Sequence, residues 1–239
     1  MITKNQIKLI KSLSLRKNRL KHKLFLVEGD KNVLDLIKSD FDVHTIFANS
    51  NWSKLNPTVN VSLVSKNELL RISNQKNPNN VLAIACIKES KIFNERGLVL
   101  VLDDISDPGN LGTIIRTCDW FGVRSIICSN NTVDVYNPKV VQSTMGSLFR
   151  VKVMYTDLAK YLKKVKSDVY GTLFDGKNIK KVDFKEDIHI VMGNESNGIS
   201  KEISKYITEK IKINSKSTKA DSLNVAVATS IILYEITNS

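Results

Sequence analysis

The segment from Leu98 to Gly122 constrains the fold most, because a short apolar strand runs directly into a turn and an amphipathic helix. Pro108 and Gly109 are typical turn residues, since proline fixes φ and glycine frees it. Asn110 is expected to cap the helix by accepting a hydrogen bond from an early backbone N–H. One apolar stripe follows Asn110 at helical spacing and is formed by Leu111, Ile114, Ile115 and Cys118.

Arg116 lies just off that stripe, roughly in line with Thr113 and Trp120. It is a cation at the edge of a packed face, close to the carboxyl end of a strand. Open α/β sheets build their ligand sites in this region. Arg116 is therefore the first candidate functional residue.

The rest of the chain alternates apolar strands with helices. In the second half we expect further strands at 125–128, 169–174 and 188–192, and helices at 138–148 and from about 222 to 236. Strands that are apolar throughout are typical of a parallel sheet covered on both faces. The first half reads as a smaller α/β unit. We place the domains at 1–90 and 98–239, joined by a charged linker at 91–97.

The charge of the chain indicates what kind of partner the protein binds. The 239 residues carry a formal net charge of +12, which favours a polyanionic partner, although a lysine-rich solvated surface explains the charge about as well. The basic stretch near the N-terminus contributes five candidates for phosphate contact: Arg16, Lys17, Arg19, Lys21 and Lys23.

Several classes of protein are disfavoured. The three cysteines have no framework spacing, which predicts reduced thiols in the cytoplasm. No cluster of cysteine and histidine has metal-ligand spacing, so no metal is expected. We find neither a signal peptide nor an apolar run of about 20 residues, so no membrane association is expected.

Two more segments carry polar residues at the ends of predicted elements. In the first, Gly193 follows a buried strand and allows close backbone approach to a ligand, and Glu195 is held just beyond the sheet. In the second, Ser222 is expected to cap the last helix, with Leu223 and Asn224 in its first turn. Each segment alone also has a plain structural explanation, namely a glutamate near a helix start and a well-capped helix.

Together and in this order, the three segments resemble the signature motifs of the SpoU/TrmH family of RNA ribose methyltransferases, in the SPOUT class. The first motif reads Asn110-Leu111-Gly112-Thr113-Ile114-Ile115-Arg116 here, the second Gly193-Asn194-Glu195, and the third Ser222-Leu223-Asn224. The N-terminal unit, with its strand end Phe25-Leu26-Val27-Glu28-Gly29, resembles the substrate-binding domain of such enzymes, which has the fold of an RNA-binding ribosomal protein.

The resemblance implies a C-terminal parallel-sheet α/β domain with a deep trefoil knot that holds S-adenosylmethionine. It implies catalytic or positioning roles for Asn110, Arg116, Glu195, Ser222 and Asn224. Arg116 would engage the ribose 2′-hydroxyl across the interface of a homodimer. Cofactor contacts would come from Thr172, Gly193, Ile211, Ile213 and Leu223.

The implied substrate is structured RNA, with ribosomal RNA favoured and transfer RNA open. One departure from the family stands out: residues 211–220, before the third motif, contain neither proline nor glycine. A non-catalytic RNA-binding assembly factor that retains the fold is therefore an alternative. A nucleotide-dependent oxidoreductase is disfavoured, because no strand is followed by a Gly-x-Gly-x-x-Gly turn.

Overall fold

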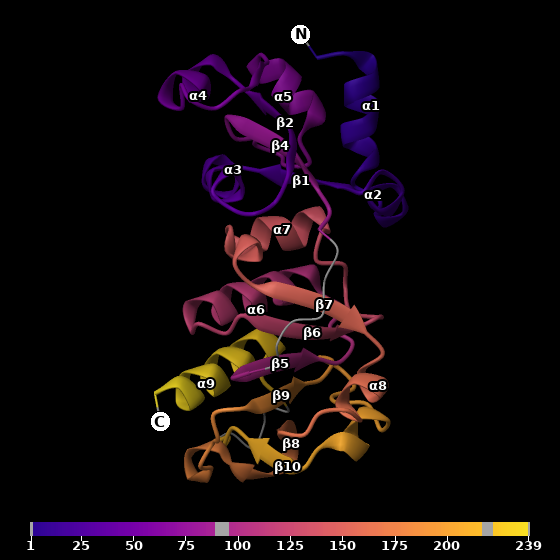
Figure 1. Cartoon of the computed structure of the whole chain (residues 1–239), viewed down its shortest axis with the longest axis vertical. Coiled ribbons are helices and arrows are strands. Elements are labelled where there is room, and N and C mark those ends of the chain that lie inside the picture. Colours follow the sequence, from indigo (N-terminus) through magenta and orange to yellow (C-terminus); the bar gives the residue numbers. More distant parts are fainter. Residues whose placement is uncertain (1, 89–95, 217–221, 239) are drawn as a thin grey trace. The chain divides into compact units, whose positions relative to one another are not determined.

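The computed structural model describes residues 2–88, 96–216 and 222–238. These residues form two compact units (Figure 1), which comprise 1–89 with 134–150, and 90–133 with 151–239. Most of the predicted linker, and residues 217–221 ahead of the third motif, lie outside the described residues. The predicted boundary between domains follows the chain, whereas the grouping by contacts takes 134–150 into the first unit.

The first unit is built on a four-stranded mixed sheet in the order β1-β4-β2-β3. The strands are β1 (Leu24–Glu28), β2 (Val43–Ala48), β3 (Ser62–Leu63) and β4 (Val81–Cys86). Its helices are α1 (Lys4–Ser12), α2 (Arg16–His22), α3 (Asp30–Ile37), α4 (Ser50–Leu55) and α5 (Lys66–Ile72). Capping boxes at Thr3 and Ser65 start α1 and α5, which pack against each other at the core of this unit.

Residues 134–150 complete the first unit. Helix α7 (Pro138–Thr144) packs on β1, and a short 3₁₀ turn (Ser147–Phe149) follows it. The ring of Tyr136 lies 4.5 Å from that of Phe25, and the ring of Phe149 lies 5.4 Å from that of Phe41, both measured between centroids. These aromatic contacts pack the segment onto Phe25 of β1 and onto Phe41, which lies just before β2.

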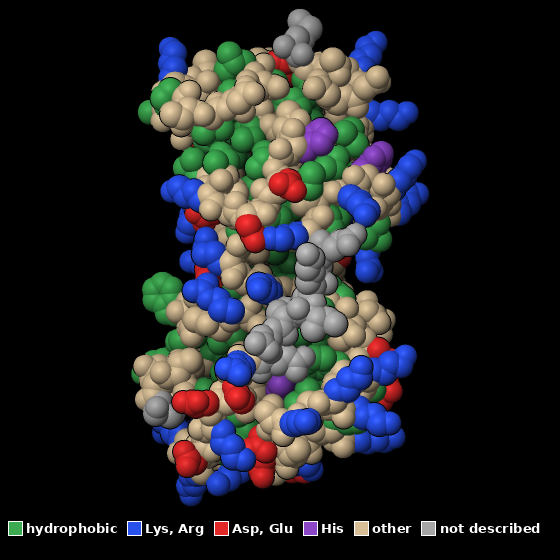
Figure 2. All heavy atoms as spheres, in the orientation of Figure 1, with side chains coloured by type: hydrophobic (Ala, Val, Ile, Leu, Met, Phe, Trp, Pro, Cys, Tyr) green, Lys and Arg blue, Asp and Glu red, His purple; other side chains and the backbone are tan. Residues whose placement is uncertain are grey.

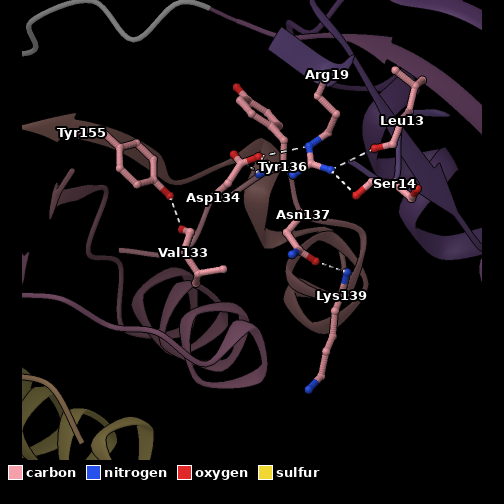
Figure 3. A network of polar contacts seen from close by, with 9 residues as sticks. All are labelled: Leu13, Ser14, Arg19, Val133, Asp134, Tyr136, Asn137, Lys139 and Tyr155. Atoms are coloured by element: carbon pink, nitrogen blue, oxygen red, sulfur yellow. Dashed lines mark hydrogen bonds and ion pairs between the residues drawn. The ribbon is translucent and has the colours of Figure 1, made fainter. Parts of the chain in front are cut away.

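A buried ion pair fixes the start of this segment (Figure 3). Arg19 is 2% exposed, and its Nη2 and Nε atoms donate to one carboxylate oxygen of Asp134 at 2.6 and 3.0 Å. Its Nη1 atom donates to the carbonyl oxygens of Leu13 and Ser14. The prediction that Arg19 contacts phosphate is therefore wrong, because its guanidinium is buried and already bonded within the unit.

The second unit contains a six-stranded sheet in the order β10-β8-β9-β5-β6-β7, and every neighbouring pair is parallel. The strands are β5 (Leu98–Leu102), β6 (Ser125–Ser129), β7 (Lys152–Thr156), β8 (Asp168–Asn178), β9 (Ile188–Met192) and β10 (Glu209–Lys212). This confirms the predicted parallel α/β sheet.

Helices cover both faces of this sheet, as Figure 1 shows. Helices α6 (Pro108–Trp120) and α9 (Val225–Thr237) lie side by side on one face. Helix α8 (Leu158–Leu162) and the 3₁₀ turn Ile203–Tyr206 cover the other, where Leu158, Leu162 and Ile203 pack on inward-facing strand residues. Burial on both faces explains why the strands are apolar throughout rather than alternating.

His189 is a buried titratable group near the start of β9. Its ring is 1% exposed; Nε2 lies 2.8 Å from the Tyr161 hydroxyl and Nδ1 lies 2.9 Å from the Ser167 hydroxyl. Both partners are neutral, and burial disfavours the charged imidazolium, which lowers the pKa of His189 to about 4.

We expect Arg19→Met to destabilise the protein strongly. The substitution leaves the Asp134 carboxylate without its cation in a largely buried position, and breaking such a pair costs about 3 kcal/mol or more. Chemical denaturation measures the change in unfolding free energy. Lys21→Met, which removes an exposed cation from the same helix, is the control and should stay within about 0.5 kcal/mol of wild type.

We also expect His189 to make the protein less stable in acid. The pKa of His189 is about 4 in the folded protein, against 6.5 for an unperturbed histidine, so the unfolded chain takes up the proton first as pH falls. The stability is complete above pH 6.5 and decreases towards pH 4, by about 3 kcal/mol in total. His189→Gln should flatten the denaturation free energy across this window, whereas His44→Gln, at an exposed position, should not. Equal pH profiles for wild type and His189→Gln would contradict the assignment.

Candidate functional site

The first two sequence motifs leave the sheet at neighbouring strand ends. Leu102 at the end of β5 pairs with Met192 at the end of β9, and the amide of Asp103 donates to the carbonyl oxygen of Met192 at 2.9 Å. The segments that follow therefore begin side by side at the carboxyl edge of a parallel sheet. This is the edge where doubly covered α/β sheets place ligands.

Asn110 lies in the first turn of α6 and does not cap it. The cap is Asp107, whose side chain accepts from the backbone N–H of Asn110 at 2.8 Å. The prediction of Asn110 as the cap is corrected for that reason. Because Asp107 satisfies the helix end, the Asn110 side chain is available, and its Nδ2 donates to the Oε1 atom of Glu195 at 2.7 Å.

The third motif joins the same group through Asn224. Its side-chain oxygen caps α9 by accepting from the amides of Ala226 and Val227, and its Nδ2 donates to the Oδ1 atom of Asn110 at 3.0 Å. Ser222 is exposed and lies two residues before the cap, so its predicted capping role is wrong. The structure thus brings Glu195, Asn110 and Asn224 into one hydrogen-bonded chain.

The loop that carries Glu195 is held by Asn194, a residue that the sequence patterns do not single out. Asn194 donates through Nδ2 to the carbonyl oxygen of Asp104 at 2.7 Å, and its Oδ1 accepts from the amides of Ser196 and Asn197. Its backbone exchanges two hydrogen bonds with Gly198. The sequence signal that could have revealed this turn is an asparagine before Glu195 followed by a glycine, Gly198. In the structure Gly198 has a φ of +65°.

Gly193 is required by the loop itself. A Cβ atom at this position would lie 2.2 Å from the carbonyl carbon of Gly198 and from the amide nitrogen of Ile199. Any side chain would therefore push the two arms of the Glu195 loop apart.

Arg116 lies two turns along α6 from the asparagine, with an exposed side chain. Within the described part of the chain it makes no ion pair or hydrogen bond. Thr113 and Trp120 lie on the same exposed face of the helix, as predicted from their spacing. An unpaired guanidinium on this face can bind an anion or stabilise a developing oxyanion.

The predicted cofactor residues lie on three elements of the second unit. Thr172, in β8, is half-buried and donates through its hydroxyl to the carbonyl oxygen of Val191 at 3.2 Å. Ile211 is buried in β10, and Ile213 follows half-buried just beyond that strand. Leu223 is half exposed beside Asn224.

The remaining basic candidates, Arg16, Lys17, Lys21 and Lys23, are exposed in the first unit. On the face drawn in Figure 2, lysine and arginine side chains are spread over both units and interspersed with acidic ones. The +12 charge is therefore not concentrated into one patch on that face. On that face, an anion would be positioned by individual side chains rather than by a broad basic surface.

Two observations on the described residues concern metals and membranes. Within residues 2–88, 96–216 and 222–238, no group of three or more histidine, cysteine, aspartate or glutamate side chains could hold a metal ion. No helix in those ranges is both long and apolar enough to cross a bilayer.

The chain matches two family models. Residues 97–234, more than half of the chain, match the SpoU rRNA methylase family, and residues 4–83 match the MRM3-like substrate binding domain. Asn110, Arg116, Glu195 and Asn224 all lie inside the first match.

Individual relatives cover nearly the whole chain. The 23S rRNA (guanosine(2553)-2′-O)-methyltransferase RlmP of Bacillus subtilis is 32% identical over 98% of this chain and 96% of its own length. A TrmH-family structure from Porphyromonas gingivalis is 34% identical with a TM-score of 0.91, covering 98% of both chains. An AdoMet-bound rRNA methyltransferase from Sinorhizobium meliloti is 28% identical with a TM-score of 0.88, covering 100% of this chain and 96% of that one. The chain belongs to the SpoU rRNA methylase family, which confirms the resemblance carried by its three motifs.

Proposed function

We propose that this protein transfers a methyl group from S-adenosylmethionine to a ribose 2′-hydroxyl in ribosomal RNA. The observation that carries the proposal is the hydrogen-bonded chain from Glu195 through Asn110 to Asn224, with the exposed Arg116 further along the same helix as Asn110. It unites all three signature motifs at one edge of a parallel sheet. The relative from Bacillus subtilis, named as a 23S rRNA 2′-O-methyltransferase, supports this substrate class.

The residues at the carboxyl edge suit S-adenosylmethionine. Ile213 and Leu223 leave apolar surface uncovered that could pack on an adenine ring. Backbone at Gly193, Ile211 and Leu223 would bind the rest of the cofactor, with Thr172 nearby on β8. When bound, the cofactor supplies an electrophilic methyl group on a sulfonium. The AdoMet-bound relative from Sinorhizobium meliloti supports the assignment.

Arg116 would act on the attacking oxygen. A ribose hydroxyl is a poor nucleophile, and negative charge develops on its oxygen as the proton leaves. Arginine stays protonated in proteins, so Arg116 serves as a donor to that oxygen rather than as the base. Asn110, oriented by both Glu195 and Asn224, would position the ribose, and Ser222 at the exposed start of the motif would contact the same region.

We further propose a homodimer through α6 and α9. Trp120 is 85% exposed, and Val227 and Tyr234 on the adjacent helix are also largely exposed apolar side chains. A hydroxyl contact between Thr117 and Ser230 holds the two helices together beneath this surface. Large exposed apolar side chains on neighbouring elements are typical of an interface. Arg116, one turn from Trp120, would then be presented to the partner's site.

The two domains would have different roles, one in RNA binding and one in catalysis. The domain at 1–90 would dock structured RNA through the phosphate contacts of Arg16, Lys17, Lys21 and Lys23, and the domain at 98–239 would carry catalysis, in the cytoplasm. The resemblance to bacterial rRNA methyltransferases and the three free cysteines support that compartment.

The proposed trefoil knot concerns the path between β10 and α9. Strand β10 is the outermost strand beside β8, whereas α9 returns to pack beside α6. We propose that the connection from β10 to α9 passes through a loop of the chain and so makes the knot, a kind of fold that is exceptional.

The activity test compares methyl incorporation by wild type and Arg116→Ala. Labelled S-adenosylmethionine is supplied with unmodified ribosomal RNA or, separately, transfer RNA. We expect label on ribose in the ribosomal RNA, and a loss of about 100-fold or more in kcat for the variant, because one oxyanion donor is removed. Cofactor affinity measured by calorimetry should stay unchanged.

Arg124→Ala is the matched control, since Arg124 is an exposed arginine whose ion pair, with Asp119 at 3.3 Å, lies on the surface. It should keep wild-type kcat. If ribose label appears in transfer RNA alone, the substrate is transfer RNA and not ribosomal RNA. Intact RNA binding without cofactor binding or incorporation would favour the assembly factor.

The dimer test substitutes Trp120 with glutamate. Burying a carboxylate in place of the indole should weaken the dimer by about 30-fold or more and produce monomers in sedimentation analysis. Phe174→Glu is the matched control, because Phe174 is an aromatic residue 81% exposed on β8 and belongs to neither α6 nor α9. A Trp120→Glu protein that remains dimeric would exclude this interface.

A further inference from the structure

The first unit contains a pocket that none of the roles above uses. Its volume is about 430 Å³, within the range of small-ligand sites. It lies between the end of β1, residues 74–75 and α7. Four side-chain amides line it, from Asn74, Gln75, Asn137 and Gln142, together with the exposed cation Lys139.

The walls of the pocket are fixed by hydrogen bonds. The Glu28 carboxylate, largely buried at the end of β1, accepts from the Ser73 hydroxyl and from the Asn74 backbone amide, the latter at 3.0 Å. The side chain of Gln75 donates to the Oε1 atom of Gln142 at 2.9 Å, which joins this loop to α7. The geometry is therefore set before any ligand arrives.

Arg19 fixes the opposite wall. Its guanidinium binds the carbonyl oxygen of Ser14, which lines the pocket, and also binds Asp134 at the start of the segment that continues to Asn137 and Lys139 (Figure 3). The buried ion pair thus connects two parts of the lining that lie far apart in sequence.

Several polar groups of the lining have no partner inside the described chain. The side-chain amide of Asn74 makes no hydrogen bond there, and the NH₂ groups of Asn137 and Gln142 are likewise unbonded within it. Glu28 is the one carboxylate among the described lining residues, and both of its oxygens are already bonded. The pocket therefore offers neutral amides to its ligand.

We propose that this pocket binds one unstacked nucleotide of the RNA, an inference that rests on the proposed RNA substrate. Asparagine and glutamine amides pair with the donor and acceptor edges of nucleobases. Asn74 and Gln142 read the base edge, while Lys139 lies close to the backbone phosphate. Leu26 and Val141, both buried, form part of the apolar wall behind these groups.

The test measures binding of a short labelled single-stranded RNA of mixed sequence to the full chain by fluorescence anisotropy. Asn74→Leu and Gln142→Leu should each weaken binding about tenfold, because a base contact is lost. A blunt RNA duplex of equal length should bind all proteins alike, since its bases are stacked. Asn67→Leu, at an exposed position on α5 outside the pocket, is the matched control and should bind like wild type.

The salt dependence separates base contacts from phosphate contacts. For both amide variants the slope of log K against log salt should equal that of wild type, whereas Lys139→Gln should reduce it by about 1. Thermal unfolding verifies that the variants are folded. Unchanged single-strand affinity in both amide variants, or equal losses for single strand and duplex, would overturn the proposal.

Methyl incorporation, assayed separately, keeps the two proposals apart. If wild type transfers methyl groups and the amide variants bind RNA normally, the nucleotide pocket is wrong and the proposed activity stands. If wild type transfers none but the amide variants lose single-strand binding, the pocket stands and the activity fails.

Discussion

The candidate site depends on one constraint, the parallel orientation of β5 and β9. Because their carboxyl ends pair at Leu102 and Met192, the segments that follow must begin next to each other. Glu195 can then accept from Asn110 across 85 residues of sequence. The packing of α9 beside α6 adds Asn224 to the same group. An antiparallel β9 would place its carboxyl end at the opposite edge and separate these residues.

The capping groups show how that arrangement is stabilised. Asp107 satisfies the start of α6 and so leaves the Asn110 side chain available to Glu195 and Asn224. Asn224 does both tasks at once, because its oxygen caps α9 while its nitrogen donates to Asn110. An amide has a donor end and an acceptor end, whereas an ionised aspartate only accepts and could not replace it in both roles. This explains why asparagine occupies the position.

The sequence predicts much of this and misses specific parts for physical reasons. Apolar strands between helices indicate the parallel sheet, and three motifs indicate the family. Two caps are misassigned, because Asp107 and Asn110 in one case, and Ser222 and Asn224 in the other, are all good capping residues within one helical turn. Local propensity does not separate such neighbours. Asn194 escapes prediction because its role depends on contacts with Asp104 that only the folded loop brings together.

Arg19 shows that the role of a charged residue cannot be predicted from its local sequence alone. It stands among exposed cations in a basic stretch, and nothing in the local pattern separates it from Lys17 or Lys21. The difference arises from Asp134, more than a hundred residues away, which turns one cation of the stretch into a buried structural partner. That burial favours a planar guanidinium, since it bonds a carboxylate and two carbonyl oxygens at once. In this unit, arginine at that position therefore holds Ser14 and Asp134 in place and is not exposed for contact with a phosphate.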